Sequence, residues 1–257
     1  MAEPVYLPVI GFARSVFTGL GLKFDITGSE RVPSRGGGVV AMNHVGYLDF
    51  ALIGLAFRPK KRMVRFMAKQ EVFDHRISGP LMRGMKHIPV DREAGAGSYQ
   101  AAVDACHGGE LVGVFPEATI SQSFELKEFK SGAARMAMEA GVPLIPVIVW
   151  GSQRVLTKGR KRDLKRGHHI RIVVGEPFTA EPGSDAVQVT KDLKARMQVL
   201  LDEARSTYRG QPRDAEDTWW IPAAMGGTAP TLEAAESAHA DVRAERAAKR
   251  RARDAGN

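Results

Sequence analysis

Apolar residues along the chain occur in short runs that alternate with segments of helical periodicity. Between Gly37 and Pro177 the runs predict strands, and the segments between them predict helices. Strands are expected at Val39–Met42, Met63–Met67, Lys86–Val90, Leu111–Phe115, Leu144–Trp150 and Ile170–Val174. Helices are expected at Leu48–Ala56, Ser78–Arg83, Ser98–His107, Gly132–Ala140 and Val187–Ser206. This order predicts an α/β fold with a mixed, largely parallel sheet flanked by helices.

The segment Val5–Leu22 predicts an N-terminal amphipathic helix, within a first region of residues 1–27. At helical spacing one side carries Val5, Val9, Phe12, Val16, Phe17 and Leu20. Arg14 and Pro8 argue against a transmembrane span, and Glu3 argues against a secretory signal. Two interpretations stay open: a helix that packs on the core, or one that lies in a membrane interface.

Composition bounds the remaining organisation of the chain. With 257 residues, 44% of them hydrophobic, it can form one large domain or two small ones. We expect the α/β domain to span residues 28–208 and a basic, in part disordered, C-terminal extension to span 209–257. A single cysteine, Cys106, excludes an internal disulfide framework and suits a reducing compartment.

The charge balance favours anionic partners, because the net charge is +8 and the isoelectric point is near 9.7. Basic residues are dense in Arg154–Arg171, which is either a solvated loop or a patch that docks on anionic lipid or an acidic carrier. The C-terminal tail is also basic, but basic and aromatic residues do not alternate in it as in known nucleic-acid modules, so no nucleic acid is expected as a partner.

The stretch Val39–Asp49, "VVAMNHVGYLD", places a histidine and an aspartate just after a predicted strand. On one continuous helix or strand His44 and Asp49 would face different directions. A strand ending at Asn43, a turn at Gly46 and a helix starting near Tyr47 would bring them together. A carboxylate hydrogen-bonded to one ring nitrogen leaves the other nitrogen free to act as a base. The alternative is a loop histidine beside a helix-capping aspartate.

Other predicted strand ends also carry polar residues. Arg92 follows the strand ending at Val90, and Glu117 and Thr119 follow Phe115 in "FPEATIS". Lys130 precedes the helix at Gly132. In sheets of this kind the strand ends and the loops after them form the sites, so we expect these residues to gather.

The stretch Val39–Asp49 resembles a motif of the glycerolipid acyltransferase family, whose best-known members are the 1-acylglycerol-3-phosphate acyltransferases. The family pattern is N-H-x-S-x-x-D. Asn43, His44 and Asp49 match it, and Gly46 stands where the family has serine.

Three further family motifs follow in the family order. The pattern I-x-x-x-R is matched by Ile88 to Arg92. The patterns F-P-E-G-T-R-S and V-P-[IV]-x-P-V are matched at Phe115, Pro116, Glu117, Thr119, Ser121, Val142, Pro143, Pro146 and Val147. Ala118 and Ile120 depart from them, and the resemblance covers about Gly28–Pro177.

The resemblance implies an enzyme that transfers a fatty acyl chain from acyl-CoA or acyl-carrier protein to the free hydroxyl of 1-acylglycerol-3-phosphate (lysophosphatidic acid), giving phosphatidic acid in phospholipid synthesis. It implies that His44 is the base and that Asp49 orients it, with no metal ion and no cofactor besides the acyl donor. It further implies that Arg92, Glu117 and Thr119 bind the acceptor and that Pro146 shapes the wall near the histidine. Since both substrates are amphiphiles, the expected location is peripheral, on the cytoplasmic face of the cell membrane.

Ile120 replaces the motif's arginine, which leaves two accounts of the acceptor open. Either Lys69 or Lys130 supplies a second cation for the phosphate, or the acceptor carries less charge. Other acceptors within the class are glycerol-3-phosphate, another lysophospholipid or a glycosylated lipid. A basic binding protein that keeps the fold without activity is the alternative from another class, and the intact His44 and Asp49 argue against it.

Overall fold

A computed structural model describes residues 4–91, 95–181 and 183–254 of the chain. The chain divides into two compact units: Met1–Ile120 with Glu128–Gly210, and Ser121–Lys127 with Gln211–Asn257. Residues 1–27, expected to be a region apart, belong to the first unit. The predicted boundary at 208/209 lies close to the start of the second unit's longer segment.

The first unit is built on a seven-stranded sheet of order β1-β7-β6-β2-β5-β3-β4. All neighbours pair in parallel except β6 and β7. The strands are β1 Lys23–Thr27, β2 Gly38–Met42, β3 Val64–Lys69, β4 Ile88–Val90, β5 Leu111–Val114, β6 Leu144–Trp150 and β7 His169–Val174. The prediction of a mixed, largely parallel α/β sheet is therefore confirmed.

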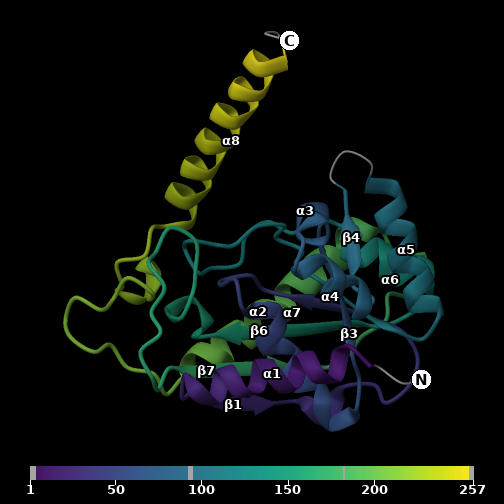
Figure 1. The fold of residues 1–257 in the computed structure, drawn as a ribbon, viewed down its shortest axis with the longest axis horizontal. Helices are drawn as coiled ribbons and strands as arrows, with labels where there is room; N and C mark the ends of the chain where they lie inside the picture. The colour runs from purple at the N-terminus through teal and green to yellow at the C-terminus, as the bar shows by residue number, and fades with distance from the viewer. Residues whose placement is uncertain (1–3, 92–94, 182, 255–257) are drawn as a thin grey trace. The chain divides into compact units, whose positions relative to one another are not determined.

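Helices flank this sheet, and Figure 1 shows their arrangement. The α-helices of the first unit are α1 Tyr6–Gly19, α2 Asp49–Ile53, α3 Gln70–Asp74, α4 Ser78–Gly84, α5 Gly95–His107, α6 Gly132–Ala140 and α7 Ala186–Ser206. The predicted helix Leu48–Ala56 is shorter, because after Ile53 the chain tightens into a 3-10 helix, Gly54–Lys60. The predicted strand at Lys86 starts later, since Lys86 has a positive φ of 56° and the His87 N–H bonds back to the Met82 carbonyl.

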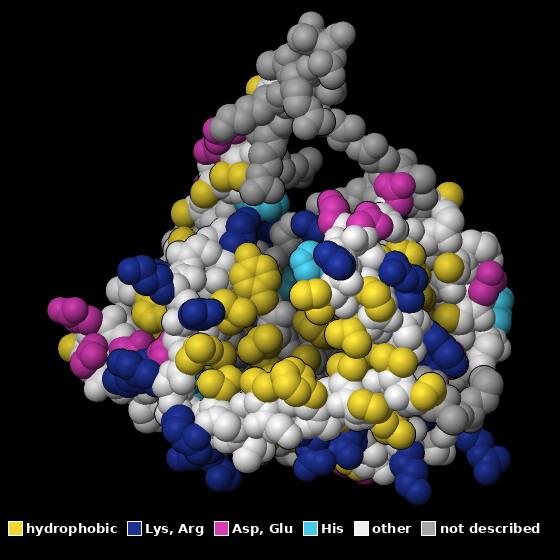
Figure 2. All heavy atoms as spheres, viewed as in Figure 1, with side chains coloured by type: hydrophobic (Ala, Val, Ile, Leu, Met, Phe, Trp, Pro, Cys, Tyr) yellow, Lys and Arg dark blue, Asp and Glu magenta, His cyan; other side chains and the backbone are white. Residues whose placement is uncertain are grey.

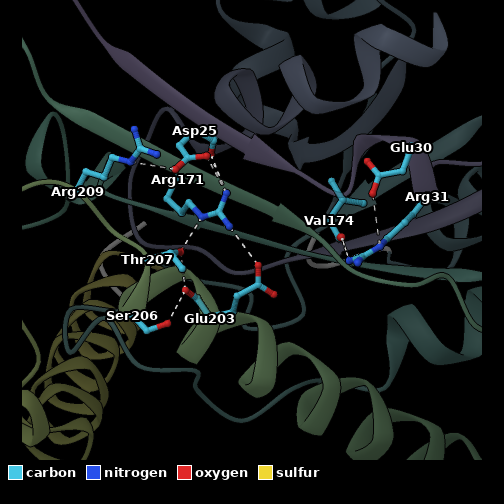
Figure 3. A network of polar contacts seen from close by, with 9 residues as sticks. All are labelled: Asp25, Glu30, Arg31, Arg171, Val174, Glu203, Ser206, Thr207 and Arg209. Atoms are coloured by element: carbon cyan, nitrogen blue, oxygen red, sulfur yellow. Dashed lines mark hydrogen bonds and ion pairs between the residues drawn. The ribbon is translucent and has the colours of Figure 1, made fainter.

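The sequence pattern did not predict β1, the edge strand that pairs with β7. Figure 3 shows how Arg171 of β7 ties this strand to α7. The Arg171 guanidinium lies 3.1 Å from Asp25 Oδ1 on β1 and 3.1 Å from Glu203 Oε1 on α7. It also donates to Thr207 Oγ1 at 3.0 Å. An arginine with 5% of its side chain exposed thus joins three elements through charged hydrogen bonds.

Helix α1 divides its predicted apolar side between the core and the surface. Tyr6 and Phe17 are buried, whereas Phe12 is 73% and Val16 41% exposed. The helix carries two adjacent apolar stripes, and the one through Tyr6, Ile10 and Phe17 faces the core. Of the predicted side, Val5, Val9 and Phe17 therefore pack inward, whereas Phe12 and Val16 lie on the surface.

The start of α1 rests on a buried polar cluster. The Tyr6 hydroxyl donates to the Val64 carbonyl at 2.8 Å, and its ring contacts His87 edge-on, with centroids 5.6 Å apart. His87 Nδ1 accepts the Phe66 N–H at 3.1 Å. Burial, together with the nearby Arg65 guanidinium, lowers the pKa of His87 to about 4. This histidine is therefore neutral and serves as a core acceptor.

The second unit consists of the loop Ser121–Lys127 and the C-terminal extension. Within it the rings of Phe124 and Trp219 meet with centroids 6.2 Å apart. The extension contains a 3-10 helix, Ala223–Met225, and α8, Leu232–Asp254. In the described part of the chain, no helix combines the length and the hydrophobicity that crossing a membrane requires.

Candidate active site

The carboxyl ends of β2, β5 and β6 meet at one edge of the sheet, because β2 lies between the other two and runs parallel to both. The chain beyond these ends supplies His44 after β2, Glu117 after β5 and Ser152 after β6. Parallel strands bring such ends together, and this edge is where sites form in open α/β sheets.

His44 and Asp49 form a direct pair. His44 Nδ1 lies 3.0 Å from Asp49 Oδ2. Strand β2 ends at Met42 and Asp49 is the first residue of α2, so the strand, turn and helix expected from the sequence bring the two side chains together. Since an ionised carboxylate only accepts hydrogen bonds, Nδ1 carries the proton and Nε2 is the basic nitrogen.

Neighbouring backbone N–H groups hold the Asp49 carboxylate, and an aromatic ring holds the His44 imidazole. Asp49 is fully buried, and its Oδ2 also accepts the N–H groups of Val45 at 2.7 Å and Gly46 at 2.8 Å. The His44 ring stacks on Phe115, with centroids 4.0 Å apart and planes 20° apart. The His44 side chain keeps 20% of its surface exposed, so a substrate can reach it.

Asn43 fixes the end of β2. Its side-chain amide donates to the Val149 carbonyl at 2.9 Å and accepts the Val149 N–H at 2.8 Å. This reproduces a strand-like pairing with β6 one residue beyond β2. The asparagine of the motif therefore sets where the chain leaves the sheet, and with it the position of His44.

Glu117 contacts the histidine through the main chain. Its Oε1 accepts the His44 backbone N–H at 3.0 Å, and the residue is buried, with 5% exposed. The next residue, Ala118, has a positive φ of 61° at the position where the family motif has glycine. A left-handed conformation strains a residue with a β-carbon, which explains the motif's glycine.

Sequence reasoning missed Ser152. It opens a 3-10 helix, Ser152–Arg154, directly after β6 and Gly151. Its hydroxyl donates to Asp49 Oδ1 at 2.5 Å, and the residue is fully buried. Ser152 lies outside all the family motifs, so no motif in the sequence indicated it. The one indirect sign was Gly46, which lacks the hydroxyl that the motif's serine has.

The remaining expected site residues lie on β3 and on the loop after β5. Lys69 ends β3, pairs with Val90 of β4 and is exposed. Lys130 is exposed, and its backbone N–H donates to the Pro116 carbonyl at 3.0 Å, which ties it to the loop of Glu117. Thr119 lies two residues beyond Glu117 and is half-buried.

Two expected site residues are not brought to His44 by the described contacts. Pro146 is buried within β6, opposite Ala41, and its carbonyl accepts the Gly175 N–H at 2.8 Å. Arg92 lies outside the described residues. Within those residues, His, Cys, Asp and Glu side chains do not form a group of three or more that could hold a metal ion.

Comparison with known proteins places these features in a family context. Residues 23–150 match the family model described as Acyltransferase. A 1-acyl-sn-glycerol-3-phosphate acyltransferase of Bacillus subtilis is 30% identical over 150 residues, which are 58% of this chain and 70% of that protein. A chloroplastic protein of the same name from Brassica napus is 28% identical over 189 residues, 72% of this chain and 49% of that protein.

A solved structure has the same fold. The crystal structure of the 1-acyl-sn-glycerophosphate (LPA) acyltransferase from Thermotoga maritima aligns with a TM-score of 0.68. The alignment covers 79% of this chain and 80% of that chain at 23% identity. At this identity the likeness shows the fold alone.

Proposed function

The chain belongs to the acyltransferase family, and on that premise we propose that it transfers a fatty acyl chain from a thioester donor to the free hydroxyl of 1-acylglycerol-3-phosphate. The proposal rests on the hydrogen bond between His44 Nδ1 and Oδ2 of the buried Asp49, at 3.0 Å. This pair lies beside the carboxyl ends of three strands. The names of the relatives support the acceptor.

In the proposed reaction His44 Nε2 takes the proton of the acceptor hydroxyl as its oxygen attacks the thioester carbonyl carbon. Asp49 holds the ring by its Nδ1–H and stabilises the positive charge that the ring gains. The C–O bond forms and the C–S bond breaks. The thiolate leaves readily, since thiol pKa values are near 8.5, and it takes the proton back from His44.

The phosphate of the acceptor requires cations, and the edge of the sheet offers candidates. Lys69 pairs with Val90, two residues before Arg92, and Lys130 is tied to the Glu117 loop. We assign Lys69 and Lys130, together with Arg92, to the acceptor phosphate, in place of the arginine that Ile120 replaces. An acceptor with a phosphodiester or a sugar is the alternative within the same class.

The substrates are amphiphiles, so the enzyme would act at a membrane surface. Figure 2 shows hydrophobic side chains gathered on the face where Figure 1 draws α1 and α2, with Lys and Arg side chains along its lower border. Phe12 and Val16 are exposed on one side of α1. Such an arrangement favours peripheral binding to an anionic leaflet, by apolar insertion and electrostatic attraction together.

The test is release of thiol from palmitoyl-CoA by the purified protein, measured with each acceptor in turn. Release should depend on 1-acylglycerol-3-phosphate and should yield phosphatidic acid. Glycerol-3-phosphate, lysophosphatidylcholine, a glycosylated lipid and a neutral monoacylglycerol complete the panel, and palmitoyl-acyl-carrier protein tests the donor. Release without any acceptor would make the protein a thioesterase, and a stronger response to another acceptor would move the assignment to that lipid.

The phosphate assignment needs a separate pair of variants. Lys69→Ala and Lys130→Ala should each raise the KM for 1-acylglycerol-3-phosphate about tenfold or more, because each removes a charged hydrogen bond. Turnover of the neutral monoacylglycerol should change little. Lys191→Ala removes an exposed lysine of α7 and is the matched control. Equal losses on charged and neutral acceptors would remove both lysines from the phosphate site.

A further inference from the structure

The glycine at position 46 marks a missing hydroxyl beside Asp49. The family motif has serine there, and Gly46 does not have the positive φ that would demand glycine. A β-carbon on Gly46 would stand 3.2 Å from Asp49 Oδ1, 3.0 Å from the Leu156 carbonyl oxygen and 3.2 Å from the Ser152 carbonyl carbon. The segment after β6 therefore occupies the space into which a serine at 46 would project.

That same segment supplies a hydroxyl to the same oxygen. Ser152 Oγ donates to Asp49 Oδ1 at 2.5 Å, and both residues are fully buried. The other oxygen, Oδ2, faces His44 Nδ1 and the N–H groups of Val45 and Gly46. Both oxygens of the buried carboxylate are thus satisfied, as a charge shielded from water requires.

The orientation of a carboxylate depends on such donors. The last torsion of an aspartate side chain is broad, so rotamer preference alone does not fix the plane of the carboxyl group. Donors on both sides of the group fix it. With Oδ1 held by Ser152, Oδ2 is directed at the histidine.

We propose that Ser152 is a positioning residue of the catalytic pair, supplying from the end of β6 the hydroxyl that the family motif supplies from position 46. It acts through Asp49 and does not touch the substrate. The inference rests on the proposed acyl transfer, because its effect is measured on that reaction. The hydroxyl that is absent at position 46 is then supplied by the 3-10 helix that follows β6.

The experiment moves the hydroxyl back. Ser152→Ala should lower kcat roughly 10- to 100-fold, the range for losing a hydrogen bond to a charged group. The KM values for palmitoyl-CoA and the acceptor should stay within about twofold. The double variant Gly46→Ser/Ser152→Ala places a hydroxyl beside Oδ1 from the other side. It should recover part of the lost kcat, because the backbone at Leu156 and Ser152 must shift by a few tenths of an ångström to admit the new β-carbon.

Matched controls separate the hydroxyl from its volume. Gly46→Ala/Ser152→Ala adds the β-carbon without the oxygen and should not recover. Ser152→Thr and Ser152→Val have nearly the same shape, and the threonine variant should exceed the valine variant in kcat about tenfold. Folding of each variant is judged by circular dichroism. If Gly46→Ser/Ser152→Ala does not fold, the comparison of threonine with valine at position 152 still shows whether the hydroxyl is required.

The outcomes are distinct. If wild type is active and His44→Ala is not, while folded Ser152→Ala keeps its kcat within twofold, the role of Ser152 is overturned. Equal recovery by the serine and alanine double variants would also overturn it, since packing alone would then explain the loss. If wild type transfers no acyl chain to any acceptor, the proposed function itself fails.

Discussion

Lowering the pH should destabilise the fold through His87. The imidazole is 6% exposed, and burial with the nearby Arg65 lowers its pKa from 6.5 to about 4. Between these values the unfolded chain binds a proton at this residue that the folded chain does not bind. Stability is therefore full above pH 6.5, falls as the pH drops through the window, and levels off below pH 4.

The size of the effect follows from the shift. Each pKa unit corresponds to about 1.4 kcal/mol, so at pH 4.5 the free energy of unfolding should have lost roughly 2–3 kcal/mol through this one group. Such a loss is a large part of the stability of an ordinary domain. It requires the ring to stay buried, with its Nδ1 accepting the Phe66 N–H.

The assay is urea unfolding by circular dichroism at pH 7, 5.5 and 4.5, on wild type and on His87→Asn. An asparagine oxygen can accept the Phe66 N–H in place of Nδ1 but does not titrate in this range. The variant loses ring contacts to Tyr6 and Phe66 and should be less stable at every pH. Its stability should nevertheless fall less on acidification, so the gap between the two proteins narrows. A gap that stays constant from pH 7 to 4.5 would refute the reasoning.

Three further predictions concern catalysis, membrane binding and strain. His44→Ala should lower thiol release at least about 100-fold while the fold survives, and Asp49→Asn should be similarly severe; near-normal release by folded His44→Ala contradicts the mechanism. Phe12→Glu should reduce sedimentation with anionic vesicles in high salt, whereas Thr18→Glu, which adds the same charge at an exposed position roughly 120° away around α1, should change it less; equal effects would mean that the added charge, and not the loss of apolar insertion, causes the reduction. Ala118→Gly should raise the free energy of unfolding by about 0.5–1 kcal/mol by relieving the positive φ, as urea titration can measure; a loss of stability would mean that the loop is not strained.

The sequence predicted the sheet well where its strands are buried. Strand β6, Leu144–Trp150, and helix α6, Gly132–Ala140, have the predicted bounds. Edge strand β1 was missed because its residues are exposed or half-buried and include Lys23 and Asp25, so no apolar run marks it. Its place depends on the buried Arg171, a long-range contact that no local pattern encodes.

For the site, the local part was predictable and the distant part was not. His44 and Asp49 are joined by a strand, a turn and a helix, whose signals all lie within the first motif. Ser152 contributes one hydroxyl from a loop that the sequence marked only by its neighbouring basic residues. Its role depends on the register that sets β6 beside β2, and sequence alone did not give that register.

The spacing of the supporting residues has a consequence for how the enzyme matures. His44 and Asp49 are five residues apart, but Glu117 lies 73 residues from His44, and Ser152 lies 103 residues from Asp49. Contacts of such sequence separation form late and slow folding, because the intervening chain must first be ordered. A nascent chain that has not yet added β6 therefore carries the whole first motif before Ser152 can donate to Asp49. The return of acyl transfer during refolding will report the docking of β6, and it will lag behind the recovery of helix content.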